Sequence, residues 1–150
     1  MMTVMYFHGF ASGPQGPSPK TDLLRELGYD VALIATYGDY RPAGYRAAFA
    51  RLGLEPTVPL ALMGTSLGGF WARRLGQELG RPWIAMNPAI QPSQSLRRYL
   101  GIQTRFDTGG TFTWTTADCG GMWRRSRWRC GRTCRACSFS RRMTQCSTTG

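Results

Sequence analysis

Several features that would place the protein at a membrane or in the secretory route are missing from the sequence. No apolar run approaches the length of about 20 residues that a membrane-spanning helix requires. The N-terminus, Met1 to Tyr6, has neither the basic region nor the cleavage site of a secretion signal. We therefore expect a cytoplasmic protein with no membrane partner. Its 150 residues are enough for one domain with a real core.

Acids and bases are scarce and unevenly distributed. The chain has one histidine, His8, and one lysine, Lys20, and all eight acidic residues lie at or before Asp118. The last 32 residues hold eight arginines, all five cysteines and no acid, which leaves +3 of the net +11 for the first 118 residues. The charge therefore belongs to a separate basic tail, residues 119–150. We expect no nucleic-acid partner for the rest of the chain.

The most informative stretch runs from Leu60 to Phe70. A short apolar segment precedes Gly64-Thr65-Ser66-Leu67-Gly68, and a helix-compatible run follows. In that setting G-x-S-x-G is typical of a nucleophile elbow, a sharp strand-to-helix turn that exposes the serine. Small neighbours are needed because the turn brings strand and helix into contact. An ordinary glycine-rich turn with a solvated serine is the alternative.

The rest of the first 118 residues alternates short apolar strands with helices. We expect strands at 3–7, 31–35, 59–63 and 82–86, and helices from Pro19 to Gly28, at 43–52 and at 67–79, with Leu23, Leu24 and Leu27 as the apolar face of the first helix. A short helical piece at 96–100 and an extended segment at 112–115 follow. This order predicts an α/β fold, a mostly parallel sheet with helices on both faces.

The functional loops of such a sheet lie at the carboxyl ends of its strands. Here these are 8–19, 36–42, Ser66 and 87–90, and we expect them to meet at one mouth. Tyr37 and Tyr40 of the second loop are expected to line the pocket, whereas Asp39 is expected to fix a turn.

Five short motifs together resemble the YqiA/YcfP family of small bacterial esterases with the α/β-hydrolase fold. The motifs, in the order and spacing of that family, are residues 6–12, 18–20, 64–70, 87–90 and 99–101. The resemblance covers residues 3 to about 118. It implies a serine hydrolase that acts on small acyl esters or thioesters, without a cofactor or a metal.

The resemblance also assigns the site residues. Ser66 matches the nucleophile, and the backbone N–H groups of Phe10 and Leu67 match the oxyanion donors. His8, Gly9, Gly64 and Gly68 belong to the motifs that shape the site. His8 is expected to be structural, because in this fold the triad order is Ser, then acid, then His, and His8 precedes Ser66.

The partners that would activate Ser66 are missing. A serine hydroxyl needs a base to take its proton, yet no histidine follows Ser66. The later acids, Asp107 and Asp118, do not follow a convincing strand, and Lys20 is expected at a helix start on the surface. We therefore predict that this chain is nearly inactive, with the triad acid and histidine absent.

The tail suggests why they are absent. Displacing the reading frame by two bases turns the first two bases of Cys, Phe and Ser codons into second and third bases, and T in second place encodes an apolar residue. Cys134, Cys137 and residues 138–140 would become an apolar cluster, and Met143 and Thr144 would become codons compatible with aspartate. We hypothesise that the chain is frameshifted or truncated after about residue 118 and that the tail is disordered.

Other interpretations of the tail stay open. A zinc site of Cys130, Cys134, Cys137 and Cys146 has enough ligands but lacks paired C-x-x-C knuckles. The spacing of the first three also matches an iron–sulfur loop, although the segment is hydrophilic. The main functional alternative is a non-catalytic, degenerate hydrolase domain whose arginine- and tryptophan-rich tail binds nucleic acid.

Overall fold

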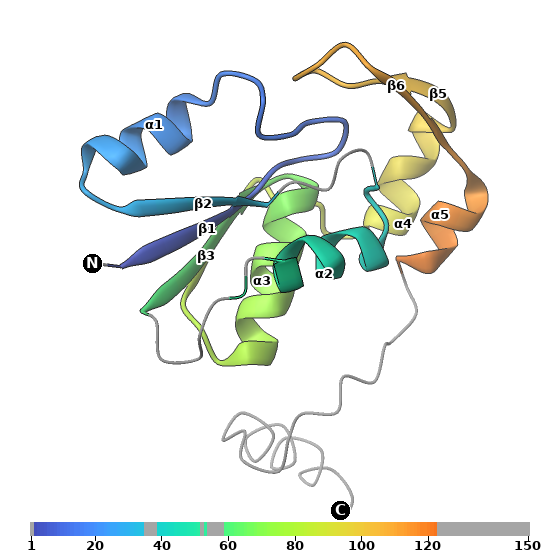
Figure 1. The fold of residues 1–150 in the computed structure, drawn as a ribbon. Coiled ribbons are helices and arrows are strands. Elements are labelled where there is room, and N and C mark those ends of the chain that lie inside the picture. The colour runs from blue at the N-terminus through green and yellow to red at the C-terminus, as the bar shows by residue number, and fades with distance from the viewer. Residues whose placement is uncertain (1, 35–38, 52, 54–58, 123–150) are drawn as a thin grey trace, which may run out of the picture.

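The computed structural model describes residues 2–34, 39–51, 53 and 59–122 (Figure 1). In chain order its elements are β1 (Thr3–Phe7), α1 (Pro19–Glu26), β2 (Asp30–Ile34), α2 (Pro42–Arg51), β3 (Leu60–Thr65), α3 (Leu67–Leu79), β4 (Trp83–Met86), α4 (Pro92–Ser95), the 3-10 helix η1 (Leu96–Tyr99), β5 (Gly101–Thr104), β6 (Thr111–Trp114) and α5 (Thr116–Gly121). The metal, nucleic-acid and disorder predictions for residues 123–150, and the prediction for Tyr37, lie outside the described residues.

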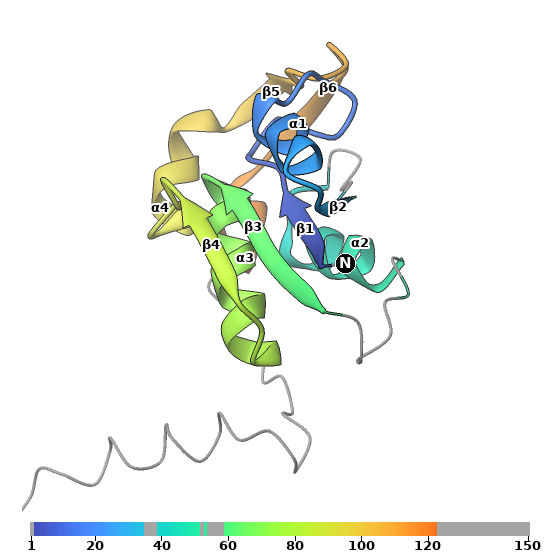
Figure 2. The ribbon, with the colours of Figure 1, turned by 90° about the vertical axis from the view of Figure 1, so that its left-hand side faces the viewer.

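The central sheet has the strand order β2-β1-β3-β4, and every neighbouring pair is parallel. α1 lies on one side of this sheet, and α2 and α3 lie on the other (Figures 1 and 2). The predicted α/β architecture is therefore confirmed. The observed bounds of the first four strands and the first three helices agree with the predicted ones to within about two residues, because their apolar runs and glycine or proline boundaries are strong local signals.

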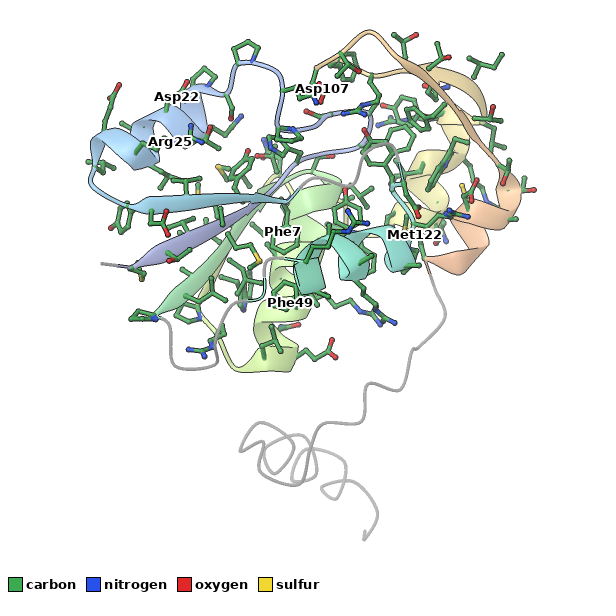
Figure 3. All side chains as sticks on the ribbon, viewed as in Figure 1. Phe7, Asp22, Arg25, Phe49, Asp107 and Met122 are labelled. Atoms are coloured by element: carbon green, nitrogen blue, oxygen red, sulfur yellow. The ribbon has the colours of Figure 1, made fainter. Side chains whose placement is uncertain are left out.

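The face of the sheet toward α2 and α3 carries the main core. Met5, Phe7 and Leu62 are fully buried there. The Phe7 ring stacks on Tyr45 of α2 at 6.4 Å between centroids, and Tyr45 stacks on Trp71 of α3 at 5.3 Å. Figure 3 places Phe7 between the strands and these helices. This apolar layer holds α3, and hence the turn before it, against the sheet.

The opposite face is only partly covered. α1 packs beside β2 and buries Thr21, while Leu23 and Leu27 are 54% and 64% exposed. The predicted apolar face of α1 is therefore wrong for these two leucines, because the helix lies over the β2 end of the sheet with too little surface beneath it. At the other end, β4 has no strand on its outer side within the described residues, and Ile84 is 57% exposed (Figure 2).

Two strands form an antiparallel hairpin after the main sheet. β5 pairs with β6, with Gly101 opposite Trp114 and Thr104 opposite Thr111. The sequence predicted the helical piece at η1 and the extended segment around β6, but α4, β5 and α5 were missed. The boundary drawn after residue 118 falls inside α5, whose Cys119 is buried together with the following Met122.

Among the helices of the described ranges, none combines the length and the apolarity needed to cross a bilayer.

Candidate active site

Ser66 occupies the turn between β3 and α3. Its backbone is in the left-handed region, with φ 55° and ψ −119°, and its side chain is exposed. A positive φ is costly for a residue with a Cβ and persists only where the surroundings impose it. Here the Ser66 N–H donates to the Met86 carbonyl at 3.0 Å, and the Ser66 carbonyl accepts from Phe70 and Ala89 N–H at 3.1 and 3.0 Å. The turn is therefore fixed from β4 as well as from α3.

Two glycines let the strand and helix approach this closely. A Cβ on Gly64 would overlap the backbone of Gly68, and a Cβ on Gly68 would overlap the Phe7 and His8 carbonyl groups. The first turn of α3 therefore packs directly on the carboxyl end of β1. This contact brings Ser66 beside the loop that follows β1, where the ideal Cβ position of Gly9 lies 3.6 Å from Ser66 Cβ.

Phe10 follows Gly9 at the centre of an aromatic cluster. Its ring lies 5.3 Å from Tyr40, 5.4 Å from Tyr99 and 5.1 Å from Trp114 between centroids. These rings come from the segment before α2, from η1 and from β6, so distant parts of the chain hold this loop. Tyr40 is fully buried behind Phe10 and does not line the cavity, contrary to the prediction.

The hairpin and Tyr40 are both joined to the loop after β1 by hydrogen bonds. Phe106 N–H donates to the Ala11 carbonyl at 2.8 Å, and the Tyr40 hydroxyl donates to the Ser12 carbonyl at 2.8 Å. Burial raises the pKa of Tyr40 to about 12, so its hydroxyl keeps the proton that it donates. Asp107, between β5 and β6, pairs with Arg105 at 2.6 Å and lies against Gly13 of the loop, with its side chain only 2% exposed (Figure 3).

A cavity of about 310 Å³ opens at Ser66. In the described part of the chain, Ala11, Ser66 and Asn87 are the only non-glycine residues with positive φ, at 57°, 55° and 42°. All three line this cavity, together with Phe10. They follow β1, β3 and β4, so the predicted meeting at one mouth is observed for three of the four loops, whereas no described residue of 36–42 lines the cavity. Backbone strain gathered around one cavity is typical of a functional site.

The cavity also has walls that the sequence did not indicate. Ser95, Arg98, Tyr99, Gln103 and Phe106 line it from α4, η1 and the hairpin. Tyr99 was noted only as part of a motif, and the others were not singled out. Asn87 was noted only in a turn motif, although asparagine tolerates positive φ better than most residues. No local signal marked the rest, because their placement depends on how the hairpin packs.

His8 directly follows β1. Its ring is nearly perpendicular to the Tyr6 ring, and the two ring centroids are 5.2 Å apart. Its side chain is buried, and Nε2 has no hydrogen-bond partner among the described residues. Burial lowers the pKa of His8 to about 4, and the charge of Asp107 opposes this shift only in part. His8 is therefore neutral at neutral pH, and its carbonyl accepts from the Tyr45 hydroxyl at 3.1 Å.

The other titratable candidates have partners away from Ser66. Asp107 binds Arg105, and Asp118 forms a capping box with Thr115 at the start of α5. Asp39 accepts from the Arg41 backbone and side chain, as expected for a residue that fixes a turn. Lys20 is exposed in the first turn of α1. Within the described ranges, no hydrogen bond engages the Ser66 hydroxyl.

The candidate oxyanion donors are the backbone N–H groups of Leu67, which follows Ser66 in the chain, and of Phe10, which lines the same cavity. Leu67 N–H is the first amide of α3 and has no acceptor within the helix. Phe10 and Ser66 line the same cavity. A carbonyl oxygen placed between them would meet a helix N-terminus, where partial positive charge favours a developing anion.

Comparison with known proteins places the chain in a family. A model of the uncharacterised protein family UPF0227 matches residues 3–120. The chain belongs to this family. UPF0227 proteins of Shewanella loihica and Yersinia pseudotuberculosis are each 30% identical to it, over 99 and 101 residues. These matches cover 62% of this chain and 54% of each relative, so the chain spans about half the length of the curated relatives it matches. The match ends inside α5, at the second residue of the basic tail.

Proposed function

We propose that the UPF0227 domain of this chain is a carboxylic ester hydrolase in which Ser66 is the nucleophile. The observation that carries the proposal is the strained, exposed Ser66 at a strand-to-helix turn, beside a cavity. Ordinary turns do not need a serine at φ 55°, and such strain accumulates where a side chain has a task. Leu67 and Phe10 N–H are the proposed oxyanion donors.

In this mechanism Ser66 Oγ attacks the carbonyl carbon of an ester or thioester, and its proton passes to a base. The carbonyl oxygen gains negative charge and accepts hydrogen bonds from the two N–H groups. Collapse of the tetrahedral intermediate releases the alcohol or thiol, protonated by the conjugate acid of the base, and leaves an acyl-Ser66. Water then hydrolyses that ester by the same steps.

The base lies outside the described residues in this proposal. His8 is buried and neutral, and Asp107 and Asp118 are engaged elsewhere. The 150-residue chain should therefore react slowly, because general acid–base catalysis contributes roughly 100- to 10,000-fold. The location of the triad acid and histidine in a restored reading frame remains part of this proposal, to be checked by resequencing the gene through codon 119 and beyond.

A fluorophosphonate probe tests the assignment directly. We expect slow labelling that peptide mapping places at Ser66 and that Ser66→Ala abolishes. Ser95→Ala is the matched control, because Ser95 is exposed and lines the same cavity from α4. Equal labelling of Ser95 or of other serines would contradict the nucleophile assignment, and labelling of Ser66 at the rate of an intact serine hydrolase would contradict the missing base.

A further inference from the structure

The side chains that line the cavity at Ser66 carry formal charge of only one sign. Among the described residues that line it, Arg98 carries the only formal charge, and no acid is present. Ser66 lines the cavity from the turn before α3, and Arg98 lines it from η1. A ligand that contacts both residues would therefore meet a hydroxyl nucleophile and a cation.

Arg98 is held in place without being neutralised. Its guanidinium carbon lies 5.0 Å from the centroid of the Tyr99 ring, a cation–π arrangement. Tyr99 in turn packs on Phe10 at 5.4 Å. Arg98 is exposed and forms no ion pair with any acid of the described residues. Its N–H groups are thus available to an outside anion.

The size of the cavity limits that anion. A volume of about 310 Å³ corresponds to roughly ten water molecules. A compact ester with one acidic group fits this space, and the aromatic rings of Phe10, Tyr99 and Phe106 would contact its short carbon chain. A planar guanidinium binds carboxylate and phosphate through paired hydrogen bonds, and both are therefore suitable acids.

We propose that Arg98 is a specificity residue that selects short-chain esters or thioesters bearing a carboxylate or phosphate group. The anion lies on Arg98 over the Tyr99 ring while the scissile carbonyl lies at Ser66. This inference rests on the proposed hydrolase function, whose nucleophile it uses, but it concerns binding and does not require turnover.

Binding to the full 150-residue chain can be measured by NMR titration with two matched ligand pairs. Monomethyl succinate carries a carboxylate on the acyl side, and methyl levulinate replaces it by a neutral methyl ketone of the same size. 2-Acetoxyethyl phosphate carries a phosphate on the alcohol side, and 2-acetoxyethanol lacks it. We expect the anionic member of at least one pair to bind about tenfold more tightly, as for a hydrogen-bonded charge.

Variants then assign the preference to Arg98. Arg98→Gln should remove this preference, because it weakens the binding of the anionic ligand and leaves the binding of the neutral ligand unchanged. Arg98→Lys should retain part of the preference. Arg97→Gln is the matched control, because Arg97 is an exposed neighbour on η1 that does not line the cavity. The pair that shows the Arg98-dependent preference identifies the anion as carboxylate or phosphate.

The inference is overturned if neither pair shows a preference, or if Arg97→Gln abolishes the preference as fully as Arg98→Gln. Its failure is distinct from that of the proposed function. Ser66→Ala should keep the anion preference, because the hydroxyl is not needed for binding. Loss of the preference with Ser66 labelling intact would contradict only the role of Arg98, whereas a retained preference without labelling would contradict only the nucleophile.

Discussion

The two faces of the central sheet differ in how completely they are packed. On the side of α2 and α3, Phe7 and Leu62 are fully buried, and the backbone of α3 touches the end of β1 at Gly68. On the side of α1, Ile84 of β4 is 57% exposed, and Leu27 of α1 is 64% exposed. We call the side of α2 and α3 the closed face and the side of α1 the open face. The elbow packs on the closed face through the contact of Gly68 with the end of β1. Substitutions on the two faces should therefore differ sharply in effect.

The largest effect is expected for Gly68→Ala. The added Cβ would overlap the Phe7 and His8 carbonyl groups, which are backbone and cannot move aside cheaply. We expect a loss of more than about 4 kcal/mol in the free energy of unfolding, enough to prevent folding of a marginal domain. Circular dichroism and urea unfolding would measure it.

Gly120→Ala is the matched control for this helix-glycine change. Gly120 lies in α5, and its Cβ would meet no atom within 4 Å. Alanine there should be neutral or stabilise by about 0.5–1 kcal/mol, because it favours the helix more than glycine does. Equal destabilisation by both changes would show that the closed contact between α3 and β1 is not the cause.

Leu62→Ala removes a fully buried side chain from the closed face. The lost transfer free energy and the remaining cavity should lower the free energy of unfolding by about 2–5 kcal/mol. The midpoint of urea unfolding would fall, with little change in the slope. A loss below about 1 kcal/mol would mean that this face is much looser than described.

The pH dependence of stability reports on His8, which lies beside Tyr6 at the end of β1. The unfolded chain binds the imidazole proton below about pH 6.5, whereas the folded protein does so only below about pH 4. Stability should therefore fall as the pH drops from 6.5 to 4, by up to about 3 kcal/mol.

The comparison with His8→Gln isolates this contribution. Carboxylates titrate in the same range in both proteins, and His8 is the only histidine of the chain. The wild-type curve should thus be steeper between pH 6.5 and 4 than that of the variant. Parallel curves would contradict the burial of a neutral imidazole at this position.

The smallest destabilisation is expected for Ile84→Ala, the open-face counterpart of Leu62→Ala. Ile84 pairs with Met63 on the neighbouring strand, but more than half of its surface already meets solvent. We expect a change below about 1 kcal/mol in the free energy of unfolding. A loss as large as that of Leu62→Ala would show that the two faces are equally closed.

Local signals predicted the closed part of the molecule well. The apolar run of β1 and the glycines around Ser66 are short-range patterns with a direct steric meaning, and α3 was placed to the residue. Non-local contacts were not accessible in this way. β5 is only four residues long, and the hairpin that it forms with β6 carries Phe106, which lines the cavity. The exposure of Leu27 likewise depends on where α1 meets the sheet.

Chemical rescue of the missing base tests the central claim most directly. Hydrolysis of 4-nitrophenyl acetate would be followed with increasing imidazole for the wild-type chain and for Ser66→Ala. The rate measured with Ser66→Ala gives the background reaction of imidazole itself and is subtracted from the wild-type rate. We predict almost no Ser66-dependent rate without imidazole and a rise of about tenfold or more with it, because a free base then accepts the serine proton. Identical rates for the two proteins at every imidazole concentration would contradict Ser66 as the nucleophile.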